Sequence, residues 1–546
     1  MKRNTLILFF ITLTLPVFAQ KNIIQRAMED ELNRNMTELR LDTLDKPFYI
    51  SCSIQDVKVY SITAAMGGII SSFEMPRRFK SDRVLVGGYE FNDESVDNNL
   101  FSAPEANDID LPLDDDYWGI RRALWVSIDN VYKNATRQFS QNKATLRDQK
   151  KPLNEIPHRT FAKVPAPQLS LDFTPPSFDR AQWEDNLRRL SKRFVLTEYP
   201  GSNVVFNYVY GYKYFVSSEG ASIKVPVQQA FLQVTVVGRD DEGEISYDQN
   251  TWSGRTPDDL PVLSQLELHV DALIAQLEES RKMKKFEEEY TGPVLFEGSS
   301  VVDIFSGVFF GGREQLMFDN NIQSLSGLRT DRGTSMESRI GKSVVSPLLT
   351  VKALAHVKKY KDTGLLGAFE ADSEGVVPPD EVVLIEKGIL KDLLNDRTIT
   401  SPLQKANGHR DGPGVIMVSA SDALNQKDLK NKLIAQAKEA GLDYALIVRG
   451  GSPVRLGMFT VHKVHVSDGK EEMLRNARLS SLAMKNIRKV TASIEEVVYN
   501  IPSFEGELSF TSYIVPQTLL VGEIDIVNAE LPIYKEEEFV KSPHKK

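Results

Sequence analysis

Cysteine is almost missing from this chain, since Cys52 is the only one among 546 residues. A single cysteine excludes an intramolecular disulfide and any structural zinc site made of several thiolates. Stability therefore has to come from buried side chains. A chain of this length with 41% hydrophobic residues has enough of them for two or three domains.

Long hydrophobic runs and an excess of positive charge are lacking as well. After the first twenty residues, no segment approaches the roughly 20 consecutive apolar residues that a membrane-spanning helix needs. The formal net charge is −9, whereas nucleic-acid binding relies on a basic surface that releases counterions from phosphates. We therefore expect no membrane anchor and no nucleic-acid partner.

The first twenty residues, MKRNTLILFFITLTLPVFAQ, form a distinct segment. Lys2 and Arg3 precede an apolar run from Leu6 to Leu15, and the cleavage pattern Val17-Phe18-Ala19 follows. This arrangement predicts a signal peptide over residues 1–19 and an exported protein, periplasmic or secreted. No cysteine follows closely enough to favour attachment to a lipid.

Residues 20–290 alternate between helical and strand-like patterns, which predicts an α+β opening domain. Apolar spacing favours helices over 23–39, from the acidic residues 114–116 past Tyr132, and from Leu266 towards Tyr290. Strand-like runs occur at 57–60 and 84–86, and the stretches 204–216 and 231–237 predict a hairpin. Prolines crowd between 150 and 177, which predicts a linker or an extended surface excursion.

A domain boundary is predicted near Tyr290, so that residues 291–546 form a second domain. One helix is indicated over 425–441, with Gly441 at its end, before a buried strand at 444–448. Aliphatic runs on both sides of Glu386-Lys387-Gly388 predict a hairpin over 384–394. The fold class that we expect for the whole chain is α+β.

Motifs of known catalytic chemistry are scarce. There is no Gly-x-Ser-x-Gly elbow and no Gly-x-x-x-x-Gly-Lys loop, and Cys52 has no evident partner histidine. His462 and His465 form a His-x-x-His, but residues three apart in a strand point to opposite faces, so we interpret them as surface or interface residues.

Two loops carry weaker candidates. His409 lies in a glycine-rich loop, where it is a candidate contact for a carboxylate or phosphate of a substrate. Asp372 and Glu374, ahead of Gly375, are either a cation site or an acid–base pair, or more simply turn formers.

Five segments resemble, in the same order, those of the TldD/PmbA (TldD/TldE) peptidase family. They are Tyr214–Gly220, Gly367–Val376, Leu384–Arg397, Leu456–Phe459 and Tyr513–Val521. The stretch TGPVLFEGSSV at 291–301 is similar to the metal-binding segment of that family. The resemblance covers most of the chain from about 204 to 527 and is weak before 150.

The resemblance implies that catalytic members bind zinc through His-Glu-x-x-x-His, where this chain has Phe296, Glu297 and Val301. It also implies a cysteine ligand near the C-terminus, and residues 501–516 contain none. Phenylalanine and valine offer no lone pair to a metal, and Glu297 alone keeps the carboxylate that accepts a proton from metal-bound water. We therefore expect no metal and no cofactor in this chain, Glu297 as a vestigial catalytic residue, and Phe296 and Val301 in the core.

The resemblance further implies an α/β N-terminal domain over 20–290 and a β-rich C-terminal domain over 291–546. It also implies dimer assembly, commonly of a zinc-bearing subunit with a zinc-free relative, and peptides or unfolded protein as substrate. Our first hypothesis is the non-catalytic subunit, paired with a zinc-bearing TldD-like homologue or with itself. One alternative is a stand-alone protein for peptide binding or assembly. The other is an active metallopeptidase with an atypical site, for example at His462 and His465.

Overall fold

The computed structural model describes residues 22–40, 44–96, 110–150, 152–156, 158–175, 177–196, 201–239, 245–311, 315–318, 336–450, 457–503 and 509–529. The predicted signal peptide and Leu456 of the fourth family-like segment lie outside these residues. Within them, the helices are all too short or too polar to cross a membrane. The fold is α+β, as predicted.

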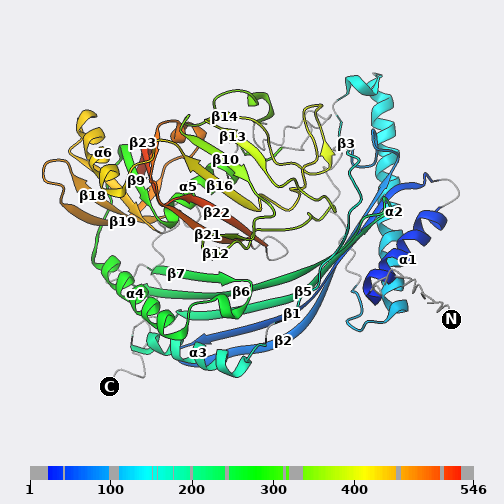
Figure 1. The fold of residues 1–546 in the computed structure, drawn as a ribbon, viewed down its shortest axis with the longest axis horizontal. Coiled ribbons are helices and arrows are strands. Elements are labelled where there is room, and N and C mark those ends of the chain that lie inside the picture. The colour runs from blue at the N-terminus through cyan, green and yellow to red at the C-terminus, as the bar shows by residue number, and fades with distance from the viewer. Residues whose placement is uncertain are drawn as a thin grey trace, which may run out of the picture.

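A long, arched sheet forms the N-terminal half (Figure 1). Its strands follow the order β2-β1-β5-β6, and β4 and β7 both pair with β6. Their bounds are β1 Pro47–Ala65, β2 Gly68–Val86, β4 Gln168–Ser170, β5 Asn203–Ser217, β6 Ser222–Arg239 and β7 Ile245–Gly254. The hairpin predicted from 204–216 and 231–237 is confirmed as β5 and β6, which pair antiparallel along almost their whole length.

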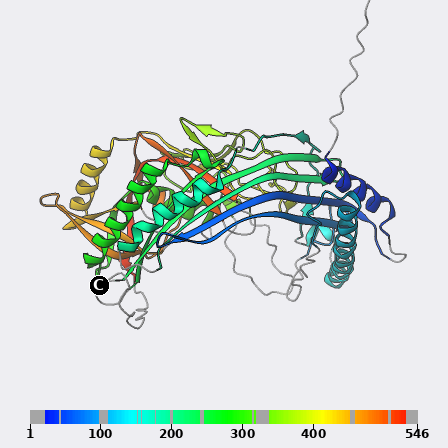
Figure 2. The same cartoon turned by 90° about the horizontal axis from the view of Figure 1, so that it is seen from below.

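Four helices pack on this sheet at its two ends (Figures 1 and 2). Near one end lie α1 (Ile23–Glu38) and α2 (Tyr117–Gln149), and near the other lie α3 (Arg180–Lys192) and α4 (Leu263–Lys282). The predicted helices are confirmed. Asp116 caps α2 by accepting a hydrogen bond from the Gly119 amide, which stabilises the exposed N–H groups of the first turn.

Alternation along the strands separates two faces of the sheet. On β1, Ile50 and Cys52 belong to the hydrophobic core beneath α1 and α2. The intervening residues Ser51, Ser53 and Gln55 instead line a cleft on the opposite face. This is the period of two expected of a strand with different surroundings on its two sides.

The C-terminal half contains two further sheets, above the concave side of the arch in Figure 1. In the first, β23 pairs with both β9 and β19, so that β23, β9, β17, β18 and β19 close into a ring, to which β20 and β8 add. Its strands are β8 Lys284–Lys285, β9 Tyr290–Glu297, β17 Tyr444–Arg449, β18 Phe459–His465, β19 Glu471–Leu479, β20 Val490–Ala492 and β23 Thr518–Asn528.

The second sheet runs β14-β13-β10-β16-β22-β21. Its strands are β10 Leu349–Ala353, β13 Val382–Glu386, β14 Ile389–Leu390, β16 Val415–Ala420, β21 Glu496–Ser503 and β22 Ser509–Pro516. The predicted hairpin at 384–394 is confirmed, because β13 and β14 pair antiparallel. Lys387 and Gly388 between them have positive φ values of 47° and 79°, as a two-residue type I′ turn requires.

Two helices complete this half. Helix α5 (Ser299–Ser306) follows β9 directly, and α6 (Gln426–Glu439) is the helix predicted over 425–441. Buried side chains from both sheets and α5 form one continuous core.

The proline-rich stretch runs extended between the two halves of the chain. Its strand β3 (Thr160–Phe161) pairs with β15 (Thr398–Ile399), which belongs to the C-terminal half, and β4 pairs with β6 of the arched sheet. The structure therefore confirms the predicted extended conformation. A short pair, β11 (Lys359–Tyr360) and β12 (Thr363–Gly364), lies beside the second sheet.

Candidate functional site

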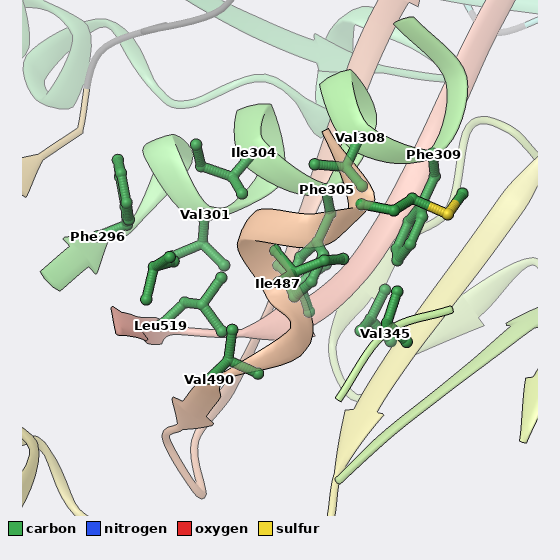
Figure 3. Close-up of a cluster of buried hydrophobic side chains, with 14 of the residues drawn as sticks. Phe296, Val301, Ile304, Phe305, Val308, Phe309, Val345, Ile487, Val490 and Leu519 are labelled. Carbon is green, nitrogen blue, oxygen red and sulfur yellow. The ribbon is translucent and has the colours of Figure 1, made fainter. Parts of the chain in front are cut away.

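The junction of β9 and α5 is where the family-like motif lies. Gly298 joins the two elements with φ 68° and ψ −132°, a conformation that strongly favours glycine. Phe296 and Val301, on either side of it, are both 0% exposed, so their prediction as core residues is confirmed. Figure 3 shows Val301 and Phe305 of α5 directed towards the side chains of Ile487 and Leu519.

Glu297 ends β9 and points into an ion-pair network. Its Oε2 accepts a hydrogen bond from Arg449 Nε at 2.9 Å, and its Oε1 accepts one from Gln426 of α6 at 3.1 Å. Arg449 also donates to Glu471 at 2.6 Å, and hydrogen bonds from Arg449 and Lys430, led by that from Arg449, lower the pKa of Glu471 to about 2. The carboxylate of Glu297 therefore has cationic and amide partners within the chain.

His462 adjoins the same network, whereas His465 does not converge with it. His462 Nδ1 lies 3.1 Å from Arg449 Nη1 and 3.5 Å from Glu471, and burial followed by the Arg449 charge lowers its pKa. A guanidinium beside an imidazole repels a metal cation. His465 lies opposite Tyr444 at the far end of the strand pair.

These residues do not fit a zinc ion. Two of the three positions that the family motif uses carry only hydrocarbon, and the third, Glu297, is bound to Arg449. Throughout the described residues, no group of three or more histidine, cysteine, aspartate or glutamate side chains is placed to hold a metal. Cys52 is buried in the arched sheet, and burial raises its thiol pKa.

A second site lies between the arched sheet and the C-terminal loops, which we call the central cleft. It has a volume of about 830 Å³. The sheet contributes polar side chains such as Ser51, Ser53, Gln55, Ser81 and Gln229, and the C-terminal half contributes segments 366–371, 373–374 and 410–414. Apolar walls come from Phe215, Val225, Val227, Phe310, Met317, Phe369 and Phe510. Apolar and aromatic walls with a few polar groups are typical of ligand-binding clefts.

Most charged groups of the central cleft are paired. Arg83 binds both Glu94 and Glu374, and Arg410 binds Asp396 at 2.6 Å and lies 3.8 Å from Glu374. Elsewhere in the cleft, Lys358 pairs with Glu370 at 2.5 Å, and Lys213 lies 3.8 Å from Asp411. The charges opposing Arg83 hold its pKa well above the usual range despite its burial.

Asp372 and Glu374 shape the loop and join the two halves of the molecule. Asp372 accepts hydrogen bonds from the amides of Glu374, Val376 and Arg410, which confirms the interpretation as a turn former. Burial and the neighbouring Glu374 raise its pKa to about 7. Glu374 accepts hydrogen bonds from Arg83 of β2 and from the Arg397 amide.

The interpretation of His409 as a substrate contact is wrong, because the side chain is 1% exposed. Its Nδ1 donates to the Asn407 carbonyl at 2.8 Å, and its ring meets Phe369 edge-on at 5.7 Å. The glycine-rich sequence suggested an open loop, but the side chain of His409 packs inside the fold, whereas the following residues 410–414 line the cleft.

Comparison with known proteins places these sites in a family. Residues 290–528 match the family model described as the PmbA/TldA metallopeptidase C-terminal domain. Residues 290–528 therefore form a domain of the PmbA/TldD family. This domain contains β9, α5 and the position of the metal motif. No curated protein sequence matched the chain.

Solved structures share the fold of this PmbA/TldD-family chain. One is a proposed modulator of DNA gyrase from Thermotoga maritima, with 13% identity, a TM-score of 0.54, and coverage of 91% of this chain and 100% of that one. A second is TldE from Thermococcus kodakarensis, with 12% identity, a TM-score of 0.51, and coverage of 92% and 100%.

A third structure, a proposed modulator of DNA gyrase from Bacteroides thetaiotaomicron, has 12% identity, a TM-score of 0.52, and coverage of 93% and 98%. At such identities the likeness concerns the fold. It extends over both halves of the PmbA/TldD-family chain and not only the matched domain.

Sequence reasoning missed the arginines of this PmbA/TldD-family chain that gather around the cleft. The fully buried Arg397 donates to Glu219 and to the Ala162 carbonyl, and its guanidinium lies 4.0 Å from the centre of the Phe161 ring. A single arginine in a hairpin sequence gives no sign of partners more than 170 positions away. Only its place within a family-like segment, Leu384–Arg397, hinted at a special role.

Proposed function

We propose that this chain is the non-catalytic, zinc-free subunit of an exported peptidase complex that acts on peptides or unfolded protein. The observation that supports the proposal is the composition of the β9–α5 junction. Phe296 and Val301 are buried hydrocarbon where the family motif has histidines, and Glu297 is held by Arg449. The scaffold is retained while the means of binding and using a metal are replaced.

In such a complex the zinc and the activated water belong to a partner subunit, a TldD-like homologue with an intact His-Glu-x-x-x-His. This chain supplies shape and substrate contact through the central cleft, which combines polar and apolar walls on a scale suited to a short peptide segment. TldE of Thermococcus kodakarensis, whose solved structure covers 92% of this chain, has a similar fold.

The test is reconstitution with a signal-bearing homologue that carries the intact motif. We expect the chain alone to cleave no peptide, and the mixture to cleave peptides and elute as a mixed dimer in gel filtration. Replacing the motif glutamate of the partner should abolish cleavage, whereas Glu297→Gln in this chain should leave it unchanged. Zinc-dependent cleavage by this chain alone would overturn the proposal in favour of an atypical metallopeptidase.

Two further outcomes would also oppose it. If the chain remains a monomer and the homologue is equally active without it, the stand-alone binding protein is the better description. Export is tested separately by sequencing the N-terminus of protein recovered from the native host. We expect it to begin at Gln20, after cleavage behind Ala19.

A further inference from the structure

Arg255 differs from the other cations of the central cleft. It follows β7 immediately, lines the cleft, and is half-buried. Its Nη2 donates to the Leu365 carbonyl at 3.0 Å, which uses one of the five N–H groups of a guanidinium. Among the described residues, no carboxylate lies within ion-pair distance of it, whereas Arg83, Arg410, Lys358 and Lys213 each have one.

The nearest carboxylates are engaged elsewhere. Asp259 accepts hydrogen bonds from the amide and hydroxyl of Thr256, and Glu370 pairs with Lys358. Both affect Arg255 only by electrostatic attraction at a distance, and burial lowers the pKa of Arg255 despite this attraction. A partly desolvated guanidinium without a counter-ion is costly unless a ligand supplies the negative charge.

Gln229 stands beside Arg255 on the same side of the sheet. Ala230 pairs with Gly254 across β6 and β7, so the next residues along, Gln229 and Arg255, are cross-strand neighbours. Gln229 also lines the cleft, and its buried Oε1 has no hydrogen-bond partner within the described part of the chain. Arg255 thus lacks an anionic partner, and the Oε1 of Gln229 lacks a hydrogen-bond donor.

We propose that the central cleft binds a peptide by its carboxylate, held by Arg255, with a peptide N–H donated to Gln229. A peptide offers both groups within one residue, and Val225 and Val227, further along β6, provide an apolar wall for its side chains. A planar guanidinium matches a carboxylate through two parallel hydrogen bonds. The inference rests on the proposed function and names its substrate class as peptides with a free C-terminus or an acidic side chain.

The experiment measures binding to the purified chain alone. Three N-acetylated Leu-Ala-Leu-Ala-Leu probes are compared by isothermal titration calorimetry: one with a free C-terminus, one amidated, and one amidated with glutamate at its centre. We expect at least one carboxylate-bearing probe to bind about tenfold to hundredfold more tightly than the neutral amidated probe, as loss of a charged hydrogen-bond pair implies. The probe that binds more tightly shows whether the carboxylate comes from the C-terminus or from an acidic side chain.

Variants assign this preference to the residue. Arg255→Gln should abolish the difference between the probes, and Arg255→Lys should retain part of it because the charge remains. Arg189→Gln is the matched control, since Arg189 pairs with Glu267 on the surface and lies outside the cleft. We expect that variant to bind as the wild type does.

The proposal is overturned if no probe binds, if the amidated neutral probe binds the wild type as tightly as both others, or if Arg255→Gln keeps the preference. Should Arg255→Gln not fold, the wild-type comparison and Arg255→Lys still decide. Because the partner subunit is absent from this assay, a lack of probe binding leaves the reconstitution result unaffected. A failed reconstitution likewise leaves the result of the binding assay unaffected.

Discussion

At the scale of single residues, burial decides which polar groups are available for chemistry. His409 and Glu297 were both candidates by sequence, yet one is 1% exposed and the other is bound to Arg449. Arg255, which no motif marks, lines the cleft without an opposing carboxylate in ion-pair distance among the described residues. Residue type suggested chemistry at these positions, and only the surroundings determined whether that chemistry is possible.

The burial of His409 predicts a pH dependence of stability. Burial lowers its pKa to about 4, whereas the unfolded chain titrates near the ordinary value of about 6.5. Between these values the unfolded state binds the extra proton, so the free energy of unfolding should fall as the pH is lowered from about 6.5 to 4, by up to about 1.4 kcal/mol per pH unit from this group. His409→Gln should remove that part of the slope in urea unfolding.

His465→Gln provides the control for this experiment, because His465 is only partly buried on β18. We expect it to keep the wild-type slope. An unchanged slope for His409→Gln would show that the imidazole is accessible to protons in the folded state.

At the scale of elements, the β9–turn–α5 unit shows how the segment that resembles the family's metal motif forms part of the core. The strand supplies Phe296 between Val448 and Leu519 of the neighbouring strands, and the helix supplies Val301 one turn after the glycine. Hydrocarbon at these positions adds to the core that both C-terminal sheets share. The unit stabilises the fold by burial and needs no ion.

Phe296→Ala should therefore destabilise the protein by about 3 to 5 kcal/mol, because the cavity left by a buried aromatic ring closes only in part. Urea or thermal unfolding measures the loss. Phe79→Ala is the matched control, since Phe79 on β2 is 50% exposed, and we expect a much smaller change. Equal effects of the two substitutions would contradict the assignment of Phe296 to the core.

At the scale of the whole molecule, three family-like segments meet where the arched sheet joins the C-terminal half. Gly375 has φ 74°, and a Cβ there would lie 2.2 Å from the ring of Phe215, so glycine is required by both its conformation and its neighbour. Glu219 of the first segment binds Arg397 of the third. The segments that carry the family resemblance thus form the junction that shapes the central cleft.

Glu374→Ala should weaken this junction. The change removes one partner of Arg83 and leaves the buried Arg397 amide without its acceptor, which we expect to cost about 3 to 5 kcal/mol as for a broken buried pair. Calorimetry should show the single transition of the wild type broadened or split into two. Glu386→Ala, which removes the exposed pair with Lys391, should leave the transition almost unchanged.

The sequence by itself determined many of the elements and the chemistry available at the motif positions. Local periodicity is enough to place helices such as 425–441 and the hairpin at 384–394, because their stabilising contacts repeat within a few residues. Phe296 and Val301 are equally evident from the sequence at the positions where the resembling motif has histidines, and a side chain without a lone pair is no metal ligand in any fold.

Only the tertiary structure decided which charged residues meet. Arg83 and Glu374 are 291 positions apart, and nothing in the sequence near either indicates that the other will neutralise it. The lack of a carboxylate within ion-pair distance of Arg255 among the described residues is likewise set by its surroundings, because pairing depends on distances of a few ångströms that the long strands and the C-terminal loops set together. Local patterns specify elements, whereas the charge balance of the cleft arises only once those elements are packed.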